Sequence, residues 1–271
     1  MLTNTQIIKK SAQYVSLIIG LTIIFVGLAL LSQDLVASIA NHNTQIIIIA
    51  SFVLFLAIIF QYKQTGIALE NATLYKVLQE KQALLDRDLQ MARSVQQGLI
   101  PSQIPNPPGF SLAARCLPAA NIGGDFYEFI EKSDTLNIIL GDVSGHGVSS
   151  ALVMALTNGI MNEISQKSSS PANTLNEANH YIQHYLANNI NFVTIFYAAL
   201  NINNKKMTYS KGGHLPALLF KKDTASPQML DSEGTVLGVF GDTNFLETEV
   251  QLSTGDVVIF YTDGLIEIQN S

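Results

Sequence analysis

The sequence predicts an α+β protein in three parts: an apolar N-terminal segment, a long linking helix and a strand-rich domain. Three observations support this division. Residues 1–62 are almost uncharged, with two Lys, no Arg and one acid. Residues 62–99 contain no proline and space their apolar residues as a helix does. After residue 110, short apolar runs alternate with Gly-containing turns, as strands do, and two segments have helical spacing.

Two apolar runs in the first part are candidates for membrane-spanning helices. Val15–Leu31 has 17 residues without a charge, and residues 44–62 reach 19 when their polar flanks are included. Lys9 and Lys10 precede the first run and Lys63 follows the second, which by the positive-inside rule places both ends in the cytoplasm. We therefore expect a hairpin in the inner (cytoplasmic) membrane, in contact with lipid. The alternative, a signal peptide followed by one anchor, also leaves the later residues cytoplasmic.

The charge of the remaining residues restricts the classes of partner. Residues 63–271 hold 13 basic and 20 acidic side chains. A nucleic-acid-binding domain normally presents a basic face, so we expect no nucleic-acid partner. The single cysteine, Cys116, excludes an intrachain disulfide and a zinc cluster built from cysteines, and it suits a reducing compartment.

Residues 63–99 are predicted to form a signalling helix between membrane and domain. Val77, Leu84 and Met91 recur at steps of seven, which keeps an apolar seam on one side of a helix. We expect a parallel homodimer through this helix, although two charged residues interrupt the seam. The alternative is an amphipathic helix that lies on the following domain. Four prolines in residues 100–110 end the helix and mark the start of the domain at 100–271.

The predicted elements of that domain follow from apolar periodicity and turn residues. The sequence 250–264 reads as a hairpin that turns near Thr254–Gly255, with its second strand buried on both faces. In chain order we expect a strand at 136–143, helices at 148–165 and 171–188, a β-rich segment at 191–202, two strands around a Gly-Gly-His turn within 205–222, and the hairpin at 250–264.

Three acids share a similar setting beside glycine. Asp125 follows two glycines in NIGGDFYEF, Asp142 ends an apolar strand after Gly141, and Asp263 follows a strand and precedes Gly264. Each alone is ordinary turn chemistry. Together they predict a site for a hard divalent cation, Mn²⁺ or Mg²⁺, which prefers carboxylate oxygens. The Gly-Gly-Asp motif also occurs in diguanylate cyclases, and that reading would need its own nucleotide-binding context.

Six motifs in a fixed order decide between these alternatives. The chain contains GGDFYEF, GDVSGHG, FVTIFYAAL, GGHLPALL, EGTVLG and GDVVIFYTDG. In this order, from about Met91 to Ile268, they resemble the bacterial PP2C-type serine phosphatases of the SpoIIE/RsbU class, and GDVSGHG and YTDG have no place in a cyclase. The resemblance implies a PP2C-like α/β/β/α sandwich, in which helices flank two antiparallel sheets and a two-metal site lies at one end.

The resemblance also implies a site and a reaction. Asp125, Asp142 and Asp263 would be catalytic metal ligands, Asp142 would bridge two ions, and the carbonyl of Val143 would complete one of them. Two such ions activate a water that attacks phosphorus in line. The implied activity is hydrolysis of phosphoserine or phosphothreonine on a signalling protein, most often a STAS-type anti-anti-sigma protein, by a membrane-anchored phosphatase.

Further polar residues of these motifs are expected to have lesser roles. Glu128 stands where the family usually has Asp, and we expect a solvated edge acid. Ser144 and His146 lie in the GDVSGHG loop, where we expect a positional role for His146. His214 follows Gly-Gly rather than the family's Ala-Gly, and we expect it to make a structural hydrogen bond in its turn.

The chain also departs from the family at its C-terminal end. Members normally continue for a few tens of residues beyond YTDG, with a further Asp-Asp that supplies a metal ligand, whereas this chain stops at Ser271. We therefore expect reduced or absent turnover from residues 1–271. The alternative function is a catalytically silent, phosphatase-like module that acts as a membrane-tethered binding and dimerisation element.

Overall fold

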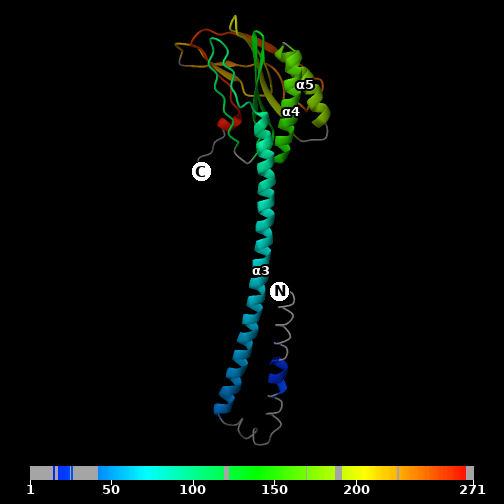
Figure 1. Ribbon diagram of the computed structural model, residues 1–271, viewed down its shortest axis with the longest axis vertical. Helices are drawn as coiled ribbons and strands as arrows, with labels where there is room; N and C mark the ends of the chain where they lie inside the picture. The colour runs from blue at the N-terminus through cyan, green and yellow to red at the C-terminus, as the bar shows by residue number, and fades with distance from the viewer. Residues whose placement is uncertain are drawn as a thin grey trace. The chain divides into compact units, whose positions relative to one another are not determined.

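The structure is a computed structural model of the chain (Figure 1). It divides into two compact units, residues 1–84 and 85–271. Only parts of the first predicted membrane span are described, and these are helical. Of the loop between the two predicted spans, residues 32–41 lie outside the described residues, and His42 and Asn43 begin a helix. The described residues are Val15, 18–24, Val26, 42–118, 122–168, 170–186, 191–224 and 226–266.

Helix α3 runs without interruption from His42 to Leu99 and therefore contains both the second apolar run and the predicted linking helix. Its stretch Gln45–Leu99 is long and apolar enough to cross a membrane, judged by length and composition alone. No other helix in the described part of the chain meets this test. The large apolar side chains of residues 46–60 are mostly exposed. The helical prediction for residues 62–99 is confirmed, and the boundary between the two compact units falls within this helix, at Leu84.

The second unit contains two antiparallel sheets. The five-stranded sheet has the order β1-β2-β3-β4-β7, and the three-stranded sheet has the order β6-β5-β8. Every strand pair in both sheets is antiparallel. The strands are β1 (Phe126–Lys132), β2 (Thr135–Val143), β3 (Val193–Asn201), β4 (Lys206–Gly212), β5 (Ala217–Phe220), β6 (Gln228–Leu230), β7 (Glu247–Gln251) and β8 (Val257–Ile259).

Strand β3 separates the two halves of the core. Its side chains alternate between faces, as the period of two in a strand requires. Ile195, Tyr197 and Ala199 belong to the apolar cluster on the helical side. The intervening residues, Phe196 and Ala198 among them, belong to the cluster shared with the three-stranded sheet. Burial on both faces explains the nearly continuous apolar sequence of this strand.

Helices α4 (Val148–Lys167) and α5 (Pro171–Leu186) contact each other and the five-stranded sheet, α4 at β1 and β2 and α5 at β3 and β4 (Figure 1). The predicted helix at 148–165, the predicted helix at 171–188 as far as Leu186, the strand at 136–143 and the β-rich segment at 191–202 are thus confirmed. So is the prediction of two antiparallel sheets with flanking helices.

The predicted hairpin at 250–264 is wrong. Strand β7 pairs with β4 in the larger sheet, whereas β8 pairs with β5 in the smaller one. The turn at residues 252–256 therefore carries the chain from one sheet to the other. Strand β8 is also not buried on both faces, because Val257 and Ile259 are 53% and 40% exposed. Its apolar run is typical of a buried strand, but the described residues cover only one side of it.

Candidate active site

Strand pairing brings Asp125 and Asp142 together. Phe126, the first residue of β1, pairs with Gly141 near the end of β2. Asp125 immediately precedes Phe126 and Asp142 immediately follows Gly141, so an antiparallel pair places both acids at the same end of the sheet. Their carboxyl groups lie within hydrogen-bonding reach of each other.

The third acid reaches this point from the other sheet. Asp263 opens a short 3₁₀ turn, Asp263–Leu265, that follows β8. The preceding Thr262 donates a hydrogen bond from Oγ1 to Oδ2 of Asp125 at 2.9 Å. Asp263 is also close enough to act electrostatically on Asp142. The three acids that the motifs single out therefore lie near one another, although Asp125 and Asp263 are 138 positions apart in the sequence.

The acidity of Asp142 is strongly perturbed. Burial raises the pKa of this carboxyl to about 7, and the adjacent Asp125 and Asp263 raise it in the same direction. Burial and like charge both disfavour the ionised carboxylate. A cation placed among these acids would reverse that penalty, so the electrostatics of the cluster favour a positively charged ligand.

Two glycines allow the close packing at this end of the sheet. A Cβ at Gly141 would lie 2.3 Å from Cε1 of the buried Phe126 ring. A Cβ at Gly124 would lie 2.6 Å from the carbonyl oxygen of Val143, so only glycine leaves room for that oxygen. The carbonyl predicted as a ligand therefore faces the loop that carries Asp125.

The donor types present fit a hard divalent cation. They are the carboxylates of Asp125, Asp142 and Asp263 and the carbonyl of Val143, and Mg²⁺ characteristically uses one or two carboxylates and keeps several waters. In the described part of the chain, no three His, Cys, Asp or Glu side chains converge closely enough to hold a metal by themselves. The structure therefore places the predicted residues near one another without closing a metal site, and their role as ligands remains a prediction.

The GDVSGHG loop is held in place by its neighbours. Ser144 accepts a hydrogen bond at Oγ from the Phe192 amide at 2.8 Å, and Asn191 donates from Nδ2 to the carbonyl of Ser144 at 2.5 Å. His146 in the same loop is exposed. The bond through Ser144 fixes the chain between the end of β2 and the start of α4.

His214 is buried behind Asp142. Its Nδ1 and Oγ1 of Thr194 are 2.8 Å apart, and this hydroxyl lies 3.4 Å from the carbonyl oxygen of Asp142. Burial lowers the pKa of His214 to about 4, so the ring is neutral near pH 7. A neutral buried histidine that contacts a threonine is consistent with the structural hydrogen bond expected for this turn.

Glu128 differs from the expected solvated acid. It lies within β1, and burial raises the pKa of its carboxyl. Its Oε1 accepts from the Phe129 amide at 3.0 Å, and its other hydrogen-bonding neighbours are Asn158 and Asn162 of α4. Glu128 is therefore half-buried between sheet and helix, because α4 covers this side of β1.

Three polar residues around the site were given no role by the sequence, although Thr194 and Thr262 lie within its motifs. Thr194 and Thr262 bond to the backbone of Asp142 and to the carboxylate of Asp125. Gln96, in the last turn of α3, bonds to Gly123 of the Asp125 loop. None belongs to a residue type that suggests chemistry by itself, and only their tertiary contacts reveal them.

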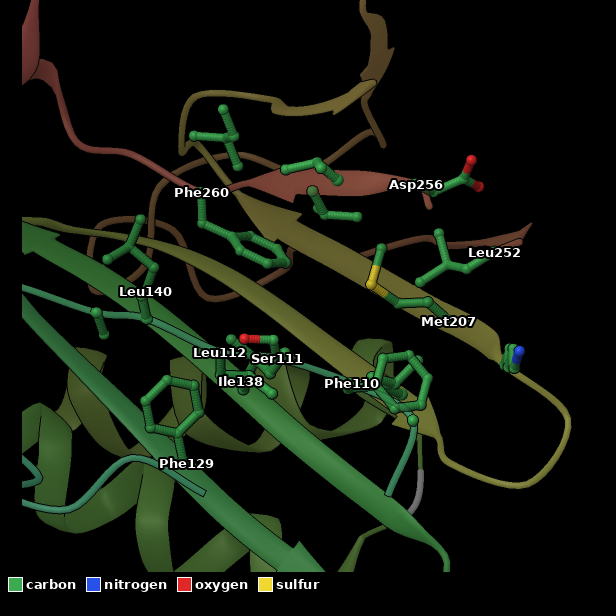
Figure 2. Close-up of a pocket in the computed structure, with 18 of the residues that line it drawn as sticks. Phe110, Ser111, Leu112, Phe129, Ile138, Leu140, Met207, Leu252, Asp256 and Phe260 are labelled. Carbon is green, nitrogen blue, oxygen red and sulfur yellow. The ribbon is translucent and has the colours of Figure 1, made fainter. Parts of the chain in front are cut away.

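A separate apolar groove of about 610 Å³ lies between the five-stranded sheet and β8 (Figure 2). Figure 2 shows Phe110, Phe129, Met207 and Phe260 facing it. None of the three acids is among its described lining residues. We therefore place the candidate active site at the acids, where titratable groups with a perturbed pKa gather, and not in the groove.

The chain is similar in sequence to two phosphoserine phosphatases. The chain is 27% identical to the phosphoserine phosphatase RsbU of Bacillus subtilis over 198 residues, 73% of this chain and 58% of RsbU. It is 24% identical to the phosphoserine phosphatase RsbP of the same organism over 185 residues, 67% of this chain and 45% of RsbP. The chain thus spans little more than half of the first relative and less than half of the second.

A solved structure supports the fold. The SiaA-PP2C domain of Pseudomonas aeruginosa superposes with a TM-score of 0.53 at 19% identity, over 65% of this chain and 71% of that one. This likeness confirms the predicted PP2C-like architecture. The family model described as Stage II sporulation protein E (SpoIIE) matches residues 132–271, which is just over half of the chain. The chain therefore belongs to the SpoIIE family.

Proposed function

We propose that this chain is a metal-dependent protein phosphatase that hydrolyses phosphoserine or phosphothreonine on a signalling protein. The observation that carries the proposal is that Asp125, Asp142 and Asp263, which come from both sheets, lie near one another. The pKa of Asp142 is raised in this cluster. Membership of the SpoIIE family and similarity to two phosphoserine phosphatases support the same chemistry.

In this proposal each residue of the cluster has a distinct task. Asp125, Asp142, Asp263 and the Val143 carbonyl would hold two Mn²⁺ or Mg²⁺ ions. Such ions, when bound, lower the pKa of a coordinated water and neutralise charge on phosphoryl oxygens. Thr262 holds one oxygen of Asp125 through its hydroxyl and so limits rotation of that carboxylate.

The proposed substrate is a phosphorylated protein, and the family resemblance favours a STAS-type protein. The proposed location is the inner membrane, with the phosphatase domain in the cytoplasm. Support comes from the exposed apolar side chains of α3 between residues 46 and 60, which would face lipid. Further along α3, Val77, Leu84 and Met91 are also exposed, and this supports a homodimer through that seam.

The test is Mn²⁺-dependent release of phosphate from a phosphoserine protein by the purified full chain, beside two variants. We expect Asp142→Asn to lose at least about 100-fold in rate, because it removes a charge from the centre of the proposed metal site. Asp134→Asn is the matched control. Asp134 is exposed in the turn at the opposite end of β2, and its variant should keep the wild-type rate.

Two outcomes would contradict the proposal. If Asp142→Asn and Asp134→Asn release phosphate equally, the activity does not come from the acid cluster. If the folded wild-type chain binds a phosphoserine protein but releases no phosphate at any Mn²⁺ concentration, the silent binding module is the better description.

A further inference from the structure

Helix α3 has one buried side chain among residues 45–99, and it is polar. Every other side chain in this range is exposed or only partly covered. This side chain is Gln96, in the last turn of the helix, which is 8% exposed. A long polar side chain is rarely buried unless its amide finds partners, because an unpaired buried amide is costly. The partners of Gln96 therefore explain its position.

Both partners of Gln96 belong to one residue. Its Nε2 donates to the carbonyl oxygen of Gly123 at 2.6 Å, and its Oε1 accepts from the Gly123 amide at 3.2 Å. A primary amide that bonds both backbone groups of a residue restricts its position and its rotation. Gly123 lies two residues before Asp125, and Gly124 between them is packed against the backbone of Val143.

The last turn of α3 is itself anchored to the domain. Asn158 of α4 donates from Nδ2 to the carbonyl oxygen of Leu99 at 3.0 Å, which satisfies one free carbonyl at the helix end. Ile100 packs against the core cluster on the helical side. The hydroxyl of Tyr127 donates to the carbonyl of Pro101 at 3.3 Å. Gln96 therefore projects from a fixed support, not from a free helix.

We propose that Gln96 is a positioning residue for the Asp125 carboxylate. It holds Gly123, and through the two-glycine segment it sets where Asp125 stands relative to Asp142 and the Val143 carbonyl. The inference rests on the proposed function, because the quantity that it controls is the geometry of the predicted metal site. Loss of such a supporting contact typically costs about 10- to 100-fold in metal affinity.

The experiment compares Gln96→Leu with Gln97→Leu in the purified full chain. Gln97 is the adjacent residue of the same helix and is exposed, so it undergoes the same chemical change without losing the Gly123 contact. Mn²⁺ binding is measured directly from the electron paramagnetic resonance signal of free Mn²⁺. The Mn²⁺ concentration for half-maximal phosphate release is measured beside it.

We expect Gln96→Leu to weaken Mn²⁺ binding about 10-fold or more and to raise the half-maximal Mn²⁺ concentration by the same factor. Gln97→Leu should match the wild type in both measurements. The proposal is overturned if a folded Gln96→Leu protein binds Mn²⁺ within twofold of the wild type.

A measurement on the wild-type protein covers two other cases: a variant that fails to fold, and a wild type that binds no metal. The amide hydrogen of Gly123 should exchange slowly with solvent, because it donates to Oε1 of Gln96, and Gln96→Met should speed its exchange by removing that acceptor. Rapid exchange of this amide in the wild type would refute the role of Gln96. Slow exchange together with an absence of metal-dependent hydrolysis would instead refute only the proposed function.

Discussion

The two walls of the candidate site are built very differently. One wall, with Asp125 and Asp142, lies at the joined ends of β1 and β2 in the five-stranded sheet. Strand β2 has nine residues and is paired on both sides. The other wall, with Thr262 and Asp263, follows β8, a three-residue strand whose described partner is β5 alone.

The core beneath these walls differs in the same way. Strand β2 contributes Ile139, which is completely buried under the helices. Strand β8 contributes Val258, which is only partly buried against the cluster between the sheets, beside the apolar groove of Figure 2. The comparison indicates that the Asp142 wall is set by packing, while the Asp263 wall depends on a few local contacts.

The largest expected effect comes from truncating the core under each wall. Ile139→Ala should lower the free energy of unfolding by about 2–5 kcal/mol, because it leaves a cavity in a fully buried cluster. Val258→Ala should cost about 1 kcal/mol or less, since its side chain is already partly exposed. Urea denaturation of both variants measures the difference. Equal costs would show that the two walls are equally well packed.

A smaller effect is expected from filling the space at Gly141. Gly141→Ala places a methyl group against the buried ring of Phe126, and overpacking of this kind costs about 1–3 kcal/mol. The matched control is Gly159→Ala on α4, where a Cβ would meet no atom within 4 Å. Alanine should there stabilise the helix by about 0.5–1 kcal/mol.

Urea midpoints of the two glycine variants should therefore move in opposite directions. A Gly141→Ala protein as stable as the wild type would mean that the Asp142 wall is less rigid than its packing indicates.

The smallest effect concerns acid and the Asp263 wall. Asp256 lies just before β8 and accepts hydrogen bonds from Lys221 at 2.8 Å and from the amides of Ser253 and Lys222 at 2.9 and 3.0 Å. The Lys221 hydrogen bond, followed by that from Ser253, lowers the pKa of Asp256 to about 2. A lowered pKa means that the ionised carboxylate stabilises the folded state above the unfolded pKa near 4, and that this stabilisation is lost as the pH falls through about 2.

Asp256→Asn is the variant that isolates this contribution. Near pH 5 the wild type should be more stable by about 1–2 kcal/mol, the usual value of a hydrogen bond to a charged group. The gap should narrow as the pH falls from about 4 towards 2, because the wild-type carboxyl then becomes protonated. Urea midpoints of both proteins between pH 5 and pH 2 provide the measurement. A gap that does not change with pH would show that the charge of Asp256 does not hold β8.

Part of the molecule was predictable because its signals are local. Apolar runs and helical spacing predicted α3, α4, α5, β2 and β3. The spacing of apolar residues within one such segment is enough to indicate a helix or a strand. The ordered motifs identified Asp125, Asp142 and Asp263 as a set and the family to which the chain belongs.

The pairing of strands was not predictable in the same way. The sequences of β7 and β8 alternate and turn as a hairpin would, yet each strand pairs in a different sheet. A turn between strands determines only that the chain changes direction. Which edge each strand then joins depends on the apolar surface that the whole domain can bury.

What the sequence determined by itself is therefore the kind of each element, the oxygen donors of the candidate site and the family. Only the tertiary structure decided how these donors meet and what supports them. The raised pKa of Asp142 comes first from burial and then from Asp125 and Asp263, which other segments supply. The hydrogen bonds between Gln96 and Gly123 join residues 27 positions apart. Such contacts leave no local pattern, because the free energy that selects them comes from burial and hydrogen bonding across the folded chain.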